Sequence, residues 1–309
     1  MDIVPSWSKV KMKGFTDHDD YLHKPTKHKD WRESFYFNWV DLQAQVSGFS
    51  TIGIVPNAPK REFVFALFVQ DTPEFYLTEP EGPIPKDFYQ ALNDGQLSYE
   101  LVNPFTDWRI HYQSPRISAE IQWRSRFPAY DFGRGSGTSW GRHLEQSGTI
   151  TGHIEYPDGR THHFKGYGQR DKSWGRRNWH IDEWFALQAQ FDDLMIGLRY
   201  DTVKGKGHLS GCVSLATETT PLVKIQLETE FEEGTIRKPI KAQTQLKDKK
   251  GRTFTIHSQL IHPVTFARYA RPFKGGETEL FEEMVTHECE ELEQTGTGLA
   301  EWLFTHKTK

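Results

Sequence analysis

The sequence predicts an all-β protein built from two antiparallel β-barrel or β-sandwich domains, with few and short helices. From Ser34 onward, apolar and polar residues alternate with a period of two in short runs, which is typical of antiparallel strands. Turn sequences such as Pro157-Asp158-Gly159 and Asp192-Asp193 separate these runs. A chain of 309 residues is also long enough for two domains of ordinary size.

The expected strands fall into two series. The first has the order of a meander and covers residues 35–39, 51–55, 62–70, 98–102, 108–112 and 117–123. The second covers residues 144–156, 161–168, 183–191, 194–202, 208–215, 222–231, 240–247, 253–262, 278–292 and 299–304. One short helix is expected at residues 84–92, because Pro85 stands near its start and Asn93-Asp94-Gly95 ends it.

The domain boundary is expected in the glycine- and serine-rich stretch 128–141, which gives an N-terminal domain of residues 1–138 and a C-terminal domain of residues 139–309. Gly133, Gly135 and Gly137 lie in this stretch. A phosphate-binding glycine run would follow a buried parallel strand and open a helix, whereas this one leads into another strand. We therefore interpret it as a linker or flap. Closed sheets of about eight strands would leave room for a small ligand.

Charge and composition exclude several classes of partner. Lysine and arginine number 38 against 42 acidic residues, so there is no basic field to attract nucleic acid or anionic lipid. The N-terminus has no signal-peptide pattern, and the longest apolar run, 63–69, is far shorter than the roughly 20 residues of a spanning helix. Cys212 and Cys289 lie in expected strands and are interpreted as reduced core thiols. We expect a soluble, cytoplasmic monomer or homodimer without a transmembrane segment.

Aromatic residues make up 14% of the chain and suit the walls of an apolar cavity, so the expected partner is a hydrophobic small molecule. Several histidines are close in sequence: His143, His153, His162, His163 and His180. They lack an HExxH pattern and a neighbouring cysteine, and we expect neither a metal nor another cofactor.

Three segments carry candidate site residues. Residues 166–180 combine glycines, tryptophans, arginines and Asp171, a mixture that is not typical of a core strand. If residues 140–146 are extended, His143 and Glu145 share one face, either in a cavity or on the polar outside of an edge strand. Residues 31–39, which include Tyr36, form either a strand that contacts a ligand or an ordinary core strand.

Two of these segments resemble the lipocalin-like family of carotenoid hydratases (hydroxyneurosporene synthases). One runs from His143 to Gly148. The other contains the family pattern G-x-x-D-[HK]-[NS]-W-G as Gly168-Gln169-Arg170-Asp171-Lys172-Ser173-Trp174-Gly175. The likeness is specific over residues 140–180 and weaker at 31–39 and 296–302. Two-domain lipocalin-like Diels-Alderases and tocopherol cyclase are more distantly similar.

The resemblance implies two lipocalin-like β-domains with a hydrophobic cavity, usually without metal or nucleotide. It also implies that Asp171 protonates an isolated double bond, after which water captures the cation. Trp174 matches the motif tryptophan, and His143 falls near an upstream histidine. Within this pattern, Lys172 and Ser173 stand where the carotenoid hydratases carry histidine and asparagine, and Gln169 replaces an aromatic residue.

We therefore expect a cofactor-independent acid–base enzyme, either a lyase of the hydratase type or an isomerase or cyclase. Its substrate would be an apolar terpenoid, polyketide or steroid-like molecule bound between or within the two domains. Asp171 would donate the proton, and His143 or Glu145 would position water or remove a proton. Substrate contacts are expected from Trp174, Trp179 and Trp184, whose rings would stabilise a cation, and from Tyr36, Arg170 and Gln169.

Alternatives to this function stay open. A pericyclic cyclase would need a shaped pocket and donors such as Arg170 or Gln169, but no essential acid. A carrier would bind the hydrophobic ligand without reaction. If Asp171 forms a plain ion pair with Arg170, Arg176 or Arg177, the segment is structural only.

Overall fold

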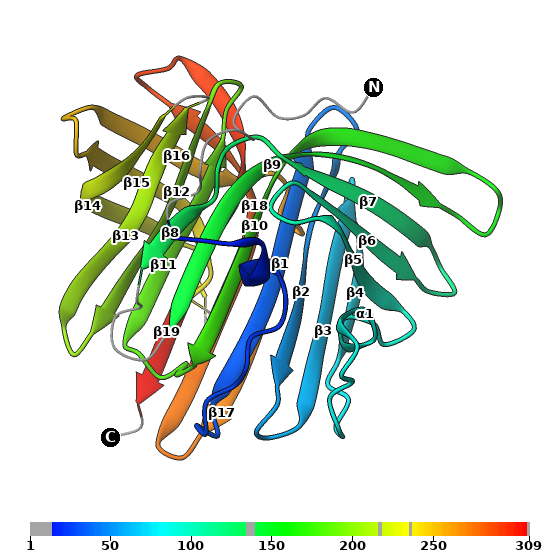
Figure 1. Cartoon of the computed structure of the whole chain (residues 1–309). Helices are drawn as coiled ribbons and strands as arrows, with labels where there is room; N and C mark the ends of the chain where they lie inside the picture. Colours follow the sequence, from blue (N-terminus) through cyan, green and yellow to red (C-terminus); the bar gives the residue numbers. More distant parts are fainter. Residues whose placement is uncertain (1–13, 134–139, 216–217, 235–236, 308–309) are drawn as a thin grey trace. The chain divides into compact units, whose positions relative to one another are not determined.

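The computed structural model describes residues 14–133, 140–215, 218–234 and 237–307, and the chain divides into two compact units, Met1–Arg177 and Asn178–Lys309. Figure 1 shows that strands dominate both units. The all-β prediction with two lipocalin-like domains is confirmed. In the described ranges, no helix is both long and apolar enough to cross a membrane.

The first unit holds one open, curled antiparallel sheet. Its elements are η1 (Asp17–Asp20), β1 (Trp31–Asp41), β2 (Val46–Val55), β3 (Lys60–Val69), β4 (Thr72–Thr78), α1 (Phe88–Ala91), β5 (Leu97–Asn103), β6 (Asp107–Gln113), β7 (Ser118–Ser125), β8 (Tyr130–Gly133), β9 (Arg142–Glu155) and β10 (Thr161–Arg176). The strand order is β4-β3-β2-β1-β10-β9-β7-β6-β5, and β8 pairs with β9. The β9–β10 hairpin thus lies between two meanders, β1–β4 and β5–β7.

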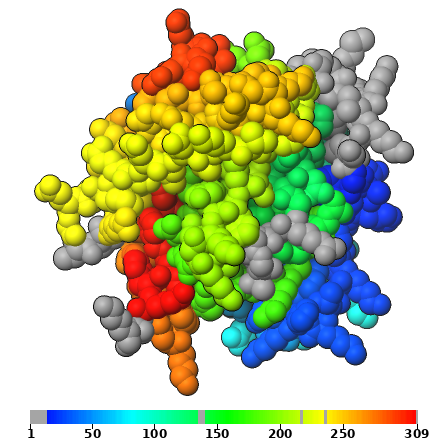
Figure 2. All heavy atoms as spheres, turned by 90° about the vertical axis from the view of Figure 1, so that its left-hand side faces the viewer, coloured from blue at the N-terminus to red at the C-terminus, as the bar shows by residue number. Residues whose placement is uncertain are grey.

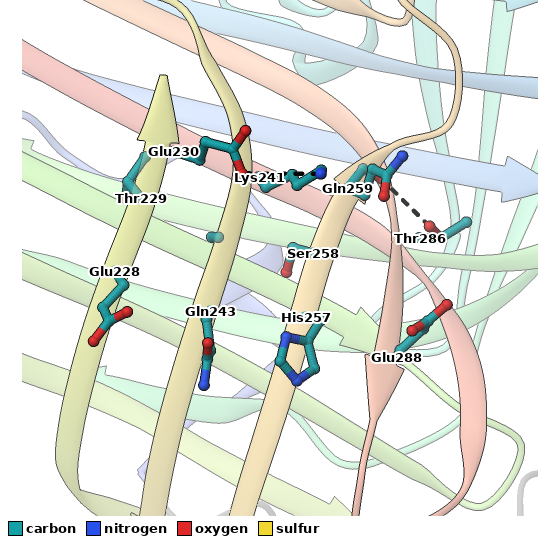
Figure 3. A pocket seen from close by; sticks show the side chains of 11 residues that line it. Glu228, Thr229, Glu230, Lys241, Gln243, His257, Ser258, Gln259, Thr286 and Glu288 are labelled. Carbon is teal, nitrogen blue, oxygen red and sulfur yellow. Dashed lines mark hydrogen bonds and ion pairs between the residues drawn. The ribbon is translucent and has the colours of Figure 1, made fainter. Parts of the chain in front are cut away.

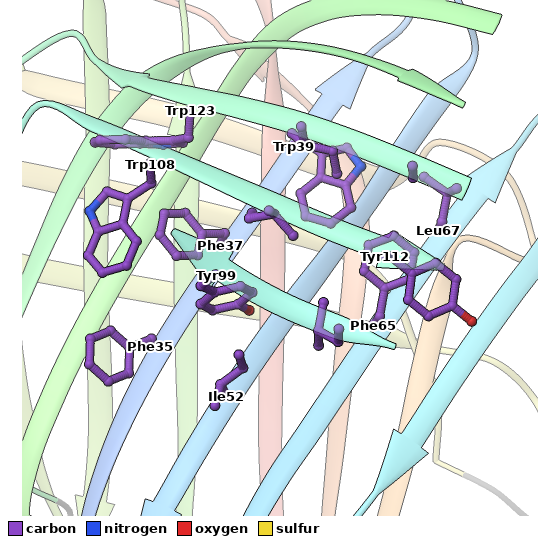
Figure 4. Close-up of a cluster of buried hydrophobic side chains, with 14 of the residues drawn as sticks. Phe35, Phe37, Trp39, Ile52, Phe65, Leu67, Tyr99, Trp108, Tyr112 and Trp123 are labelled. Carbon is purple, nitrogen blue, oxygen red and sulfur yellow. The ribbon is translucent and has the colours of Figure 1, made fainter. Parts of the chain in front are cut away.

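Aromatic side chains fill the inner face of this sheet. Phe35, Phe37 and Trp39 alternate along β1 (Figure 4). The ring of Phe37 contacts Trp108 of β6 and Trp123 of β7. The ring centroids of Phe37 and Trp108 are 5.5 Å apart, within the range of favourable aromatic pairs. Strand β1 is buried along its whole length, because it is central in the sheet and both of its faces are covered.

The second unit is a closed barrel. Its strands are β11 (Glu183–Gln190), β12 (Leu194–Val203), β13 (Lys206–Leu215), β14 (Glu218–Phe231), β15 (Pro239–Asp248), β16 (Thr253–Leu260), β17 (Phe266–Phe273), β18 (Gly276–Cys289) and β19 (Gln294–Lys307). The order is β16-β15-β14-β13-β12-β11-β19-β18-β17, and the pairing of β16 with β18 closes the ring and leaves β17 beside it. Figure 2 shows the outward side chains of β14–β16, in yellow and gold.

Several local predictions need correction. The helix is only Phe88–Ala91, because the Asp87 side chain caps it by accepting from the Gln90 backbone N–H. Strands β4, β8 and β17 were not predicted. They are short or carry little burial, and β4 and β17 each contain a proline, so their alternation is weak.

The boundary expected between residues 138 and 139 falls in the segment 134–139, which lies outside the described residues, as do Gly135 and Gly137. The strands on either side of this segment, β8 and β9, pair with each other. Since β9 and β10 complete the first sheet, the division between compact units comes after Arg177.

Candidate functional site

Three neighbouring strands position the candidate site of the first unit. In the ladder register, Tyr36 of β1 stands opposite Asp171 of β10, and Asp171 stands opposite Glu145 of β9. Side chains alternate between the two faces of a strand, so His143 and Gln169 share the face of Glu145 and Asp171. His143 and Glu145 therefore share one face of β9, as their two-residue spacing predicted.

His143 lies between two carboxylates. Its Nε2 atom is 3.6 Å from Oε1 of Glu145 and 3.8 Å from Oδ2 of Asp171. The side chains of His143 and Glu145 are 4% and 2% exposed, whereas that of Asp171 is 23% exposed. Gln169 donates from Nε2 to Oε2 of Glu145 and orients this carboxylate. Asp171 is therefore the member of the group that an incoming molecule can reach most readily.

Aromatic rings surround the imidazole of His143. The ring centroid of Phe132 is 5.0 Å away, and that of Trp140 is 4.9 Å away. Tyr36 is buried in the same cross-strand row as Asp171. Here β9 is paired on both sides, with β10 and with β8, so the alternative of a polar outer face on an edge strand is wrong.

The segment 166–176 also corrects an expectation, because it is the second half of a central strand rather than an irregular element. Gln169, Arg170 and Lys172 are all buried in β10. Neighbouring β1 and β9 supply a full ladder of backbone hydrogen bonds on both sides. The polar side chains are tolerated because each finds a hydrogen-bonding or charged partner.

Arg170 and Trp174, two of the expected substrate contacts, lie on the other face of β10 from Asp171. Arg170 donates from Nη1 to Oδ1 of Asp20 at 2.7 Å, and from Nε to Gln146 at 3.0 Å. Trp174 stacks on the ring of His23, with centroids 4.0 Å apart. An odd separation of one or three residues along a strand reverses the face. The structure thus brings together Asp171, His143, Glu145, Gln169 and Tyr36, and separates Arg170 and Trp174 from them.

Trp179 and Trp184 belong to the second unit. Their ring centroids are 5.6 Å apart, and Trp184 donates from Nε1 to Oε1 of Glu301 at 2.6 Å. The guanidinium carbon of Arg199 lies 3.7 Å from the Trp184 ring centroid. These rings therefore take part in a polar and cation–π cluster within their own unit.

Sequence reasoning missed a buried ionic group on the face of β10 opposite to Asp171. Lys172 Nζ lies 2.8 Å from Oε1 of Glu33, and both side chains are fully buried. Burial lowers the pKa of Lys172, although Glu33 opposes this effect. Burial alone would raise the pKa of Glu33, but Lys172 and His23 outweigh it and hold that pKa below its ordinary value. The signal in the sequence was Glu33, a charged residue in the same alternating register as Phe35 and Phe37 of β1.

The second unit carries a polar trough on the outside of its barrel, with a volume of about 460 Å³ (Figure 3). Two cross-strand rows form its walls, Glu228-Gln243-His257-Glu288 and Glu230-Lys241-Gln259-Thr286. Its floor is the row Thr229-Ala242-Ser258 between them. Among the side chains that the structure describes, no group of three histidine, cysteine or acidic residues could hold a metal ion.

Comparisons with known proteins agree with the architecture. A family model described as "Domain of unknown function (DUF7064)" matches residues 16–305. No curated protein matches the chain in sequence.

Solved structures similar to the chain include CghA, with a TM-score of 0.63 and 10% identity over 91% of this chain and 89% of that one. CghA with Sch210972 gives a TM-score of 0.64 at the same identity and coverage. Kievitone hydratase from Nectria haematococca gives 0.56 and 11% identity over 95% of each chain. At such identities these likenesses show a shared fold, and the carotenoid hydratase assignment itself stays a prediction.

Proposed function

The chain belongs to the DUF7064 family, and we propose that it is an acid–base enzyme that needs no cofactor and acts on an apolar small molecule with a carbon–carbon double bond. The observation that carries the proposal is the group Asp171, His143 and Glu145, in which one imidazole lies between two carboxyl groups. The proposed reaction is hydration, double-bond isomerisation or cyclisation. All three would pass through a carbocation that forms when the double bond is protonated.

The geometry supports a closed proton cycle. Asp171, the most exposed member, would give its carboxyl proton to one alkene carbon and leave a cation on the other. In a hydration, a water oxygen bonds to the cationic carbon, and His143 takes the released proton on Nε2. His143 then returns that proton to Asp171, whose Oδ2 lies 3.8 Å away. In an isomerisation, His143 would take the proton from a neighbouring carbon instead.

Glu145 and Gln169 would keep the imidazole in place during this cycle. Glu145 is held by Gln169, and its negative charge favours the imidazolium that forms when His143 takes a proton. General acid–base groups of this kind contribute typically 10²–10⁴-fold to a rate. The names of the similar structures add support at the level of the fold, because one of those proteins is a hydratase and another was solved with the small molecule Sch210972.

The test uses alkene-bearing terpenoids, polyketides and steroids, with kievitone included, and follows each reaction in deuterated water by mass spectrometry. Protonation by a carboxyl group that exchanges with solvent places deuterium on the product carbon. We expect Asp171→Asn to lower the rate about 10²–10⁴-fold, as removal of a general acid does. Asp158→Asn changes a carboxylate in an exposed hairpin turn and is the matched control.

Each alternative gives a different result. Product without deuterium, formed equally fast by Asp171→Asn, would indicate a pericyclic cyclase. Saturable binding without any product would indicate a carrier. Either result would contradict the proposed role of Asp171.

A further inference from the structure

Strand β18 places two ionisable side chains inside the second barrel. Phe281, Val285 and Cys289 belong to the barrel core, and side chains two residues apart share a face. Glu283 and His287 have the same parity and therefore point into the same interior. Both are 0% exposed. The interior of this barrel is thus not purely apolar.

The polar groups gather on one wall. Ser258 of β16 stands opposite His287 and lies 2.9 Å from its Nδ1 atom. Thr244 of β15 is buried and faces inward between Ala242 and Leu246 of the core. Burial lowers the pKa of His287 to about 3, so this ring is neutral at physiological pH.

The wall across the barrel is apolar. In the closed order of strands, β11 and β12 lie opposite β15 and β16. Their inward residues include Leu187, Ala189, Ile196 and Leu198, which are all buried core residues. An apolar surface that faces a few fixed polar groups is the usual lining of a small-molecule site.

Three groups on the polar wall have unmet hydrogen-bonding capacity. Within the described part of the chain, both carboxyl oxygens of Glu283, the hydroxyl of Thr244 and the Nε2 atom of His287 have no hydrogen-bond partner. Burial raises the pKa of Glu283 to about 8, so the carboxyl group is mostly neutral at pH 7. A neutral carboxyl group has one O–H to donate and a carbonyl oxygen that accepts. Buried polar groups nearly always have a hydrogen-bond partner in native proteins, so we expect a bound molecule to supply one for Glu283.

The charges near Glu283 favour a neutral occupant. Lys238 lowers the pKa of Glu283 and Glu232 raises it, so positive and negative charges act on the same place. Lys238 is itself engaged, with Nζ 4.0 Å from the ring centroid of Phe266. Phe266 is the cross-strand neighbour of Glu283. A charged ligand would therefore be attracted by one of these two residues and repelled by the other, whereas a neutral ligand would not.

We propose that the interior of the second barrel binds a neutral, apolar small molecule that carries a hydroxyl group. The hydroxyl accepts a hydrogen bond from the O–H of Glu283 and donates one to its carbonyl oxygen, while the apolar body contacts β11 and β12. The site lies within the second unit and does not depend on the function proposed for Asp171.

The experiment measures binding of 1-naphthol and of retinol to the full chain by fluorescence, each beside its O-methyl ether. The methyl ether keeps the apolar body and the acceptor oxygen but removes the donor. Glu283→Leu removes both hydrogen bonds, and Glu283→Gln keeps a donor and an acceptor. Glu288→Gln, an exposed change on the outside of the same strand, is the matched control. Thermal unfolding verifies that every variant is folded.

We expect the wild-type protein and Glu288→Gln to bind at least one alcohol about tenfold more tightly than its ether, the loss that follows when a buried polar group is left unpaired. Glu283→Leu should abolish this preference, whereas Glu283→Gln should keep part of it and Asp171→Asn all of it. A preference that survives in folded Glu283→Leu would overturn the proposal. So would a lack of saturable binding by both alcohols, or a crystal structure with an ordered water on Glu283 that neither alcohol displaces.

Discussion

The carboxyl group of Glu283 should make the second unit less stable as pH rises. Its pKa is raised by burial from the ordinary value of 4.5 to about 8. The folded state therefore holds a proton over a pH range in which the unfolded state has already released it. Stability then falls with increasing pH, because the unfolded state binds fewer protons than the folded state.

The size of the effect follows from these two pKa values. Each pH unit between them costs about 1.4 kcal/mol, so the loss approaches about 5 kcal/mol above pH 8 and is about 3 kcal/mol between pH 5 and pH 7. Glu283→Gln keeps a similar shape but does not titrate. Its stability should therefore lack this component of the pH dependence.

The assay compares wild type and Glu283→Gln by urea unfolding and by hydrogen exchange of the β18 amides, at half-unit steps of pH. All other titrating groups are shared, so the difference between the two proteins isolates Glu283. The variant should gain about 1.4 kcal/mol per pH unit relative to wild type over this range. A difference that does not change with pH would refute the reasoning.

Three further predictions concern packing and buried charge. Asp20→Ala leaves Arg170 buried without its carboxylate and should cost about 3–5 kcal/mol in urea unfolding, whereas Asp158→Ala, which breaks a solvent-exposed pair with Arg160, should leave the urea midpoint nearly unchanged. Gly148→Ala would place a Cβ atom 2.3 Å from the Trp123 ring and 2.6 Å from the Arg124 carbonyl oxygen, so thermal unfolding should show a loss of about 1–3 kcal/mol, and an unchanged melting temperature would contradict the packing. Cys212 and Cys289 are buried and not joined in a disulfide, and should react with a thiol reagent only after denaturation, so rapid labelling of the folded chain would show that the barrel opens.

Alternation of residues was sufficient to predict the fold class and most strands. It was least informative where burial is weak, as in β17, whose residues are mainly exposed or half-buried. It also misled at β10, because Gln169, Arg170 and Lys172 do not look like core residues. Their burial depends on Glu145, Gln146, Asp20 and Glu33, which lie far away in sequence. No local pattern contains those partners.

The candidate site, like the fold, could be predicted only in part from local sequence patterns. The two-residue spacing of His143 and Glu145 predicted a shared face, and the structure confirms it. The same rule places Trp174 on the opposite face from Asp171, since three residues separate them, and applying it there would have removed Trp174 from the expected pocket. Glu283 and His287 also left a signal, because they occupy the apolar register of Phe281, Val285 and Cys289. The pairing of β18 with β16 was needed to show that this register faces a closed interior.

The order of strands in the first sheet has a consequence for synthesis on the ribosome. The β1–β4 meander and the β5–β7 meander emerge early, but they have no direct ladder between them. The β9–β10 hairpin joins them and ends only at Arg176. Nascent chains shorter than this expose the unpaired edge of β1, which is apolar and open to wrong pairings. Chaperone demand for this protein should therefore be greatest just before the hairpin leaves the exit tunnel.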